Sequence, residues 1–252
     1  MTEAADVARR ALGLLDLTSL EDTDTEERIR ALCARAVTPV GRVAAVCVYP
    51  RFVALSKAAL AGTGVRVATV VNFPEGGESA AAAADETRDA VAAGADEIDA
   101  VLPYQAFKAG NRAAAEAVLR AVRTACGDKT LKVILETGQL GDEASMRAAS
   151  ELAADCGADF LKTSTGKTKP AATPEAARVM LGVIRARGGR IGFKAAGGIR
   201  DTATAAAYLA LADAALGAGW ATPANFRFGA SGLLDALLAD LGIGQGGPAT
   251  SY

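Results

Sequence analysis

Residues 159–195 read DFLKTSTGKTKPAATPEAARVMLGVIRARGGRIGFKA, and this stretch holds the pattern that decides the fold. Two short apolar runs, Asp159–Thr163 and Arg190–Ala195, have the length of strands, and the amphipathic stretch Thr173–Arg187 between them has the length of a helix. Thr173 followed by Pro174 is a typical helix start, because the hydroxyl can accept a first-turn N–H and proline leaves no N–H unpaired. The order strand, helix, strand predicts two parallel strands joined by a crossover helix.

The same alternation repeats along the chain. Further strands are expected at Leu14–Thr18, Arg42–Tyr49, Arg66–Asn72, Glu97–Leu102, Leu131–Glu136 and Asn225–Gly229, and further helices at Glu78–Ala93, Asn111–Cys126, Asp142–Cys156 and Thr202–Leu216. Eight such strands in about 250 residues predict an α/β fold, a single closed (β/α)₈ barrel with an extra N-terminal helical segment. The main alternative is an open doubly wound sheet, but its usual glycine fingerprint is missing.

No linker divides the chain, so we expect one barrel domain over residues 1–241. A glycine-rich tail, residues 242–252, follows it and ends in Tyr252.

The composition excludes several classes of function. The formal net charge is −2 with interspersed signs, which gives no electrostatic basis for binding nucleic acid or anionic membranes. No stretch resembles a signal peptide or has the length of a membrane span, and the four cysteines form no CxxC pair. We therefore expect a reduced, cytoplasmic protein. The chain has no histidine, which rules out Ser-His-Asp and Cys-His nucleophiles within it and argues against a catalytic zinc or another histidine-ligated metal.

Charged residues and one cysteine recur near the carboxyl ends of the expected strands, where barrel active sites lie. Asp16, Cys47, Asp99, Glu136, Lys162 and Lys194 hold these positions. Because strand side chains alternate between faces, Lys162 and Lys194 should point into the lumen on neighbouring strands. These charges could instead form purely structural salt-bridged layers. Burying several charges without a use is costly, which favours a functional role.

Two adjacent lysines suit Schiff-base chemistry, because a lysine attacks a carbonyl only as the free amine. Lowering the pKa from about 10.4 to roughly 7 requires on the order of 4.6 kcal/mol. A second ammonium about 5 Å away supplies roughly 3.3 kcal/mol at an effective dielectric constant near 20. We therefore expect the neighbouring cation to be the larger cause of the shift and desolvation the smaller one.

Three glycine-containing loops follow the last three expected strands. They contain Thr165-Gly166-Lys167, Gly197-Gly198-Ile199 and residues 229–232. The TSTGKT stretch is no nucleotide-binding P-loop, since Leu161 stands where that motif needs its first glycine. Barrels commonly bind phosphate in the loops after strands 7 and 8, where small residues let backbone N–H groups approach the anion. The alternative is that these glycines are ordinary loop residues.

Nearly the whole chain resembles deoxyribose-phosphate aldolase. The resemblance is carried by LLDLTSL, VCVYPRF, VNFPEG, GADEIDAVLPY, LKVILETG, GADFLKTSTGK, GFKAAGGIR, FRFGASGLL and the terminal tyrosine. It implies a metal-independent class I aldolase of (β/α)₈ fold that needs no cofactor. The implied reaction is the reversible cleavage of 2-deoxy-D-ribose 5-phosphate to D-glyceraldehyde 3-phosphate and acetaldehyde, in deoxyribonucleotide catabolism. A homodimer is also expected from the resemblance.

The resemblance also implies roles for individual residues. Lys162 becomes the Schiff-base lysine, Lys194 the residue that lowers its pKa, and Asp99 the carboxylate that transfers protons through water. Tyr252 matches a tyrosine that assists proton movement at C2. The substrate-pocket residues are Asp16, Cys47 and Thr165, and the phosphate-binding residues are Gly166, Lys167, Gly197, Gly198, Ser231 and Gly232. Many members have a second serine where this chain has Gly232, so one hydroxyl donor is lost while the N–H remains.

Two other functions are compatible with the same residues. One is a different Schiff-base barrel that acts on a longer ketose phosphate. The other is a sugar-phosphate-binding barrel that has lost the chemistry.

Overall fold

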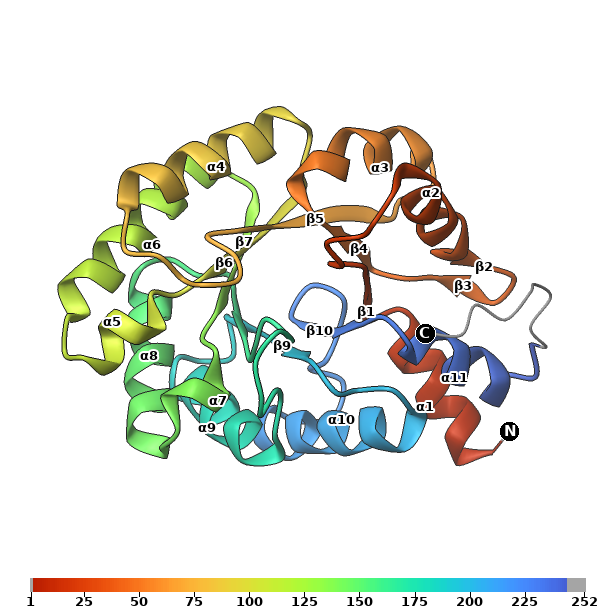
Figure 1. Ribbon diagram of the computed structural model, residues 1–252. Coiled ribbons are helices and arrows are strands. Elements are labelled where there is room, and N and C mark those ends of the chain that lie inside the picture. The colour runs from red at the N-terminus through yellow and green to blue at the C-terminus, as the bar shows by residue number, and fades with distance from the viewer. Residues whose placement is uncertain (1, 244–252) are drawn as a thin grey trace.

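The computed structural model describes residues 2–243, and eight parallel strands close into a barrel at its centre (Figure 1). The order around the barrel is β1-β10-β9-β8-β7-β6-β5-β4, and β1 pairs with both β10 and β4 to close the circle. The strands are β1 Leu15–Thr18, β4 Ala45–Val48, β5 Arg66–Val71, β6 Glu97–Val101, β7 Thr130–Ile134, β8 Phe160–Lys162, β9 Gly192–Ala196 and β10 Phe226–Ala230. The predicted (β/α)₈ fold is confirmed.

Helices form a shell around the strands, as Figure 1 shows. They are α1 Glu3–Leu12, α2 Glu26–Arg35, η1 Pro50–Phe52, α3 Val53–Ala59, α4 Ala80–Ala92, α5 Tyr104–Lys108, α6 Arg112–Cys126, α7 Thr137–Leu140, α8 Glu143–Asp155, α9 Pro174–Ala186, α10 Thr202–Leu216 and α11 Leu233–Asp240. The N-terminal helix α1 packs against α10 and α11. Within residues 2–243, no helix is long and apolar enough to cross a membrane.

Side-chain caps fix where the crossover helices begin. The Thr173 hydroxyl accepts a hydrogen bond from Ala176 N at 3.2 Å at the start of α9, and Asp201 accepts one from Thr204 N at 2.7 Å at the start of α10. Each bond satisfies a first-turn N–H that has no partner inside the helix. These caps set the length of the loops between β8 and α9 and between β9 and α10, which line the site described below.

The expected strand Arg42–Tyr49 is wrong at its beginning. Residues 37–42 form a separate antiparallel hairpin, β2 Val37–Thr38 and β3 Gly41–Arg42, and the barrel strand starts only at Ala45. The Thr38 hydroxyl donates to Gly41 O at 2.7 Å and accepts from Val40 N at 3.3 Å, and these bonds close the tight turn. Turn chemistry therefore overrides the apolar pattern here.

Apolar and charged side chains occupy opposite faces of the strands. Leu161 and Phe193 belong to the large apolar cluster that also contains the helix residues, whereas Lys162 and Lys194, which directly follow them in sequence, point into the lumen. The lumen has its own small apolar cluster on the β4 and β5 side, made of Leu20, Ala45, Cys47, Ala68 and Val70. The remaining strands contribute charged residues, and these build the site.

Candidate active site

The strand register brings three cations into one row across three neighbouring strands. Lys162 on β8 lies opposite Lys194 on β9, and Lys194 lies opposite Arg227 on β10. A fourth cation, Lys132 on β7, lies opposite Asp99 on β6. All four side chains are almost completely buried.

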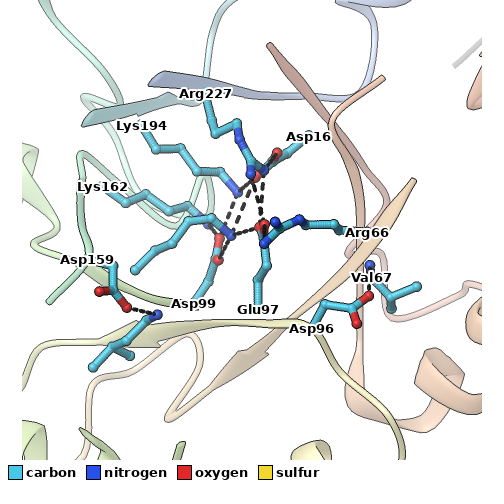
Figure 2. Close-up of polar contacts among 12 residues, drawn as sticks. Asp16, Arg66, Val67, Asp96, Glu97, Asp99, Asp159, Lys162, Lys194 and Arg227 are labelled. Atoms are coloured by element: carbon cyan, nitrogen blue, oxygen red, sulfur yellow. Dashed lines mark hydrogen bonds and ion pairs between the residues drawn. The ribbon is translucent and has the colours of Figure 1, made fainter. Parts of the chain in front are cut away.

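Asp99 is the centre of this network, as the converging side chains in Figure 2 show. Its Oδ2 accepts hydrogen bonds from Lys162 Nζ at 2.8 Å and Lys194 Nζ at 2.7 Å, and its Oδ1 accepts one from Lys132 Nζ at 2.8 Å. The nitrogens of Lys162 and Lys194 share one oxygen, so they lie no farther apart than the sum of the two distances, 5.5 Å. The predicted pair of lumen lysines is thus brought together.

Two further carboxylates complete the network. Asp16 on β1 accepts from Lys194 Nζ at 2.5 Å and from Arg227 at 2.6 Å. Glu97 on β6 accepts from Arg227 at 2.8 Å and lies 2.6 Å from Lys132 Nζ. Each carboxylate has at least two cationic partners, and across residues 2–243 no group of three or more His, Cys, Asp or Glu side chains is arranged to hold a metal ion.

The charges of this buried network decide which lysine loses its proton most readily. Four buried cations, Lys132, Lys162, Lys194 and Arg227, meet three buried carboxylates. The network therefore balances when one cation loses its proton, and an unbalanced buried charge is expensive. Lys132 lies close to three carboxylates and Lys194 to two, whereas Lys162 bonds only Asp99 within the network.

The pKa shifts of the lysines agree with the number of carboxylates that lie close to each of them. Burial, opposed by Asp99 and assisted by Lys194, lowers the pKa of Lys162. For Lys194 and Lys132, the paired carboxylates overcome burial and raise the pKa above the ordinary lysine value. Of the three lysines around Asp99, Lys162 alone is pushed toward the free amine, which is the nucleophilic form.

The expected order of causes is wrong. Desolvation is the largest cause of the lowered pKa of Lys162, and the attraction of Asp99 in the opposite direction is larger than the repulsion by Lys194. The reason is that Lys194 does not act as an isolated ammonium. Its charge is largely cancelled by Asp16 and Asp99, to which it bonds directly.

The carboxylates stay ionised despite burial. Burial opposes ionisation of Asp99, but the three surrounding lysines hold its pKa well below the ordinary value. Lys194, Arg227 and Lys132 likewise lower the pKa of Asp16, and Lys132 and Arg227 lower that of Glu97.

A cavity of about 400 Å³ opens above this network at the carboxyl ends of the strands. Its lining comes from β1, β8, β9 and β10 and the loops that follow them: Thr18, Leu20, Glu21, Lys162, Thr165, Gly166, Lys167, Ala196, Gly197, Gly198, Ile199, Arg200, Gly229, Ala230 and Ser231. Of the four cations and three carboxylates of the network, Lys162 alone lines the cavity. The network lysine with a lowered pKa is therefore also the network lysine that a small molecule can reach.

The loop after β8 is fixed by a buried glutamate. Glu136 adopts a left-handed backbone conformation with φ 54° and is fully buried. Its Oε2 accepts the Thr165 hydroxyl at 2.5 Å, and the Thr165 oxygen accepts Lys167 N at 3.0 Å. This chain of bonds orients the loop that carries Gly166 and Lys167 toward the cavity.

Glycine is required at two positions beside the cavity. Gly197 has φ 91°, and a Cβ there would lie 2.6 Å from Ala171 Cβ. A Cβ on Gly229 would lie 3.0 Å from Lys194 Cε, so the absent side chain leaves room for the lysine stem. These glycines are structural requirements of the site and not simple loop residues.

The structure separates the predicted site residues into three groups. Lys162, Thr165, Gly166, Lys167, Gly197, Gly198 and Ser231 line the cavity. Asp16, Asp99, Lys194 and Cys47 lie buried in the barrel and do not line it, and Gly232 is the N-cap residue of α11. Tyr252 lies outside the described residues. Burial also raises the pKa of the Cys47 thiol, so this cysteine is not a ready nucleophile.

Sequence reasoning missed Lys132, Glu97 and Arg227. Each interrupts an apolar strand at an inward position. Lys132 has the parity of Glu136, and Glu97 has the parity of Asp99. Arg227 alternates with Phe226 and Phe228, which belong to the large apolar cluster. Applying the alternation rule to whole strands, and not only to their ends, would have found all three.

Comparison with known proteins agrees with this geometry. Residues 10–238 match the model of the DeoC/LacD family aldolases. The chain belongs to this family. It is therefore an aldolase, a carbon–carbon lyase, built on a TIM barrel.

Solved structures of similar proteins extend the comparison. A candidate deoxyribose-phosphate aldolase from Coccidioides immitis is 32% identical, with a TM-score of 0.81 over 92% of this chain and 86% of that chain. The apo form of a candidate deoxyribose-phosphate aldolase from Toxoplasma gondii ME49 is 28% identical, with a TM-score of 0.87 over 96% and 98% of the two chains. The deoxyribose phosphate aldolase from Aeropyrum pernix, described as tetrameric, has a TM-score of 0.73 over 95% and 92% but 23% identity, and this likeness shows the fold alone.

Proposed function

We propose that this aldolase reversibly cleaves 2-deoxy-D-ribose 5-phosphate to D-glyceraldehyde 3-phosphate and acetaldehyde through a Schiff base on Lys162. The observation that carries the proposal is the lowered pKa of Lys162 at the only network position that faces the cavity. The printed names of the similar proteins from Coccidioides immitis and Toxoplasma gondii support the choice of substrate. The reaction would serve deoxyribose phosphate catabolism.

Imine formation begins the cleavage. The lone pair of Lys162 Nζ attacks C1 of the open-chain sugar, and the resulting carbinolamine loses water to give a protonated imine. This cation takes the place of a protonated Lys162 beside Asp99 Oδ2, which lies 2.8 Å from Nζ. The buried carboxylate thus stabilises the intermediate in a water-poor site, where a fixed charge is most effective.

The bond between C2 and C3 breaks next, because it lies β to the imine carbon. A base removes the proton of the C3 hydroxyl, and C3 becomes the aldehyde of D-glyceraldehyde 3-phosphate. The C2–C3 bonding electrons form the C1=C2 double bond, and the iminium π electrons return to nitrogen to give a neutral enamine. Asp99, acting through a water, is the proposed proton acceptor. Its low pKa depends partly on the charge on Lys162, so the pKa rises as the iminium becomes neutral.

The enamine is then protonated at C2, and water hydrolyses the imine to release acetaldehyde and the free amine. We propose that Lys194 keeps its charge throughout, because Asp16 and Asp99 hold it protonated. Tyr252 is proposed to assist the transfer at C2. Slower exchange of the methyl protons of acetaldehyde with solvent in Tyr252→Phe would support this role, and unchanged exchange would contradict it.

The phosphate group is proposed to bind in the loops around Gly166, Lys167, Gly197, Gly198 and Ser231. The support is that all five residues line the cavity that Lys162 enters. The pairs Gly197-Gly198 and Ser231-Gly232 offer backbone N–H groups, and Lys167 offers an ammonium. Gly232 contributes at most an N–H, since it lies at the start of α11 outside the cavity lining. The homodimer, the cytoplasmic location, the single-domain boundary at residue 241 and the absence of a cofactor stay predictions.

A comparison of two sugar phosphates as substrates tests the proposal. The purified protein is incubated with 2-deoxyribose 5-phosphate or with fructose 1,6-bisphosphate, and aldehyde release is followed for the wild type and Lys162→Met. We expect turnover of the deoxy sugar by the wild type alone. Preferential cleavage of the ketose bisphosphate would favour the longer-substrate aldolase, and binding of sugar phosphate without any cleavage would favour a non-catalytic barrel.

A further inference from the structure

The cation proposed to receive the phosphate is already engaged on the opposite wall of the cavity. Lys167 Nζ donates to Leu20 O at 2.5 Å and lies 3.7 Å from Glu21 Oε2. Leu20 and Glu21 follow β1, whereas Lys167 follows β8, and all three line the cavity. A carboxylate therefore stands at the place where a phosphate dianion would have to approach Lys167.

The backbone that carries this carboxylate is held firmly. Asp24 is 7% exposed, and its carboxylate accepts the Ser19 hydroxyl at 2.9 and 2.8 Å and Glu21 N at 3.1 Å. On the other side of the same loop, Asp22 accepts the Tyr49 hydroxyl at 3.1 Å. The loop therefore fixes the Cα of Glu21 beside the cavity. Only rotation of the side chain, which is 65% exposed, takes its charge away from Lys167.

The two kinds of ligand respond differently to this arrangement. A phosphate must displace Lys167 from Glu21 and then sit beside a like charge, which lowers its affinity. A sugar without a phosphate needs no contact with Lys167, so Glu21 leaves its binding unchanged. The charges lining the cavity are Lys162, Lys167 and Arg200 against Glu21, so Glu21 is the one acid in the lining.

We propose that Glu21 is a specificity-determining residue: it competes with the substrate phosphate for Lys167 and so reduces the preference for phosphorylated over non-phosphorylated sugars. The sugar part rests on the proposed function. The competition itself needs only an anion, and inorganic phosphate therefore tests it independently.

A graded charge series provides the test. The variants are Glu21→Gln, Glu21→Lys and the matched control Glu26→Gln, which removes an exposed glutamate of α2 that pairs with Arg30 at 3.1 Å away from the cavity lining. Binding of inorganic phosphate is measured by titration calorimetry. Values of kcat/KM are measured for 2-deoxyribose 5-phosphate and for 2-deoxyribose.

The expected order of phosphate affinity is wild type, then Glu21→Gln, then Glu21→Lys as the tightest. The first step should be about two- to five-fold, because exposed ion pairs contribute up to about 1 kcal/mol. The KM for 2-deoxyribose 5-phosphate should fall by a similar factor, and kcat/KM for 2-deoxyribose should not change. Glu26→Gln should match the wild type in every measurement.

Several results would overturn the proposal that Glu21 competes with phosphate for Lys167. They are equal phosphate affinity in wild type and Glu21→Gln, weaker affinity in Glu21→Lys, an equal change for both sugars, or no phosphate binding by any variant. Failure of the proposed function looks different: 2-deoxyribose 5-phosphate is not cleaved by any variant, while the calorimetric order still decides whether Glu21 opposes an anion at Lys167.

Discussion

Replacing Lys194 with leucine should move the pH dependence of the reaction toward alkaline pH. The two nitrogens lie at most 5.5 Å apart, since both bond to Asp99 Oδ2 at 2.8 and 2.7 Å. At an effective dielectric constant near 20, a full charge at this separation would repel Lys162 by about 3 kcal/mol, or about two pKa units. This is the upper limit of the shift, because Asp16 and Asp99 cancel part of the Lys194 charge. Losing Lys194 also leaves more of the Asp99 charge for Lys162, which raises the pKa of Lys162 in the same direction.

Activity at neutral pH should fall, because only the unprotonated amine of Lys162 attacks the substrate carbonyl. A higher pKa leaves less free amine at neutral pH, so the acid limb of kcat/KM shifts up by as much as about two units and activity near pH 7 falls up to about 100-fold. Activity at the alkaline plateau is retained, because the nucleophile itself is intact.

The assay is kcat/KM for cleavage of 2-deoxyribose 5-phosphate over the range in which the protein stays folded. Borohydride trapping with acetaldehyde at each pH provides a second readout that does not need the carbon–carbon step. Lys57→Leu is the matched control, because Lys57 pairs with Asp96 at 2.8 Å on the outside of the barrel. An acid limb that coincides with that of Lys57→Leu would refute the electrostatic part of the reasoning and leave desolvation as the whole cause.

Three other predictions concern the buried network and its chemistry. Lys162→Met should unfold at the same or a higher temperature than the wild type, because the remaining charges balance. Lys132→Met removes the ammonium that lies 2.6 Å from Glu97 and 2.8 Å from Asp99 Oδ1, and should cost about 3–5 kcal/mol, or roughly 6–20 °C in Tm by calorimetry. The lowered pKa values of Asp16, Glu97 and Asp99 stabilise the fold above their unfolded values of about 4, so the urea midpoint should hold down to about pH 4 and fall below it; a loss beginning near pH 6 would contradict this. Prolonged treatment with EDTA should leave the rate of aldehyde release unchanged, and inactivation reversed by a divalent metal would overturn the metal-independent mechanism.

The sequence was sufficient for the barrel and for the two central lysines. Strand–helix alternation predicts the architecture. Because successive side chains of a strand point to opposite faces, Lys162 and Lys194 are expected to point inward on neighbouring strands, and the register places them opposite each other. The hairpin at Val37–Arg42 was missed because its tight turn depends on hydrogen bonds of one threonine, which no apolar pattern reveals.

The energetics of the site could not be predicted from strand ends alone. Lys194 and Lys162 are adjacent in register, but Asp16 and Glu97 come from other strands and meet the cations across the lumen. These cross-lumen pairs decide that Lys194 is neutralised by its partners, and they make burial the larger cause of the lowered pKa of Lys162. Closure of the barrel determines them, and no single strand contains this information.

The most direct test is to incubate the protein with acetaldehyde and borohydride and to map the labelled peptide by mass spectrometry. Because Lys162 alone combines a lowered pKa with access to the cavity, a single ethyl group should be found on its Nζ, with Lys132 and Lys194 unmodified. A label on Lys194 or Lys132, or no label at any lysine of the network, would contradict the assignment of the nucleophile.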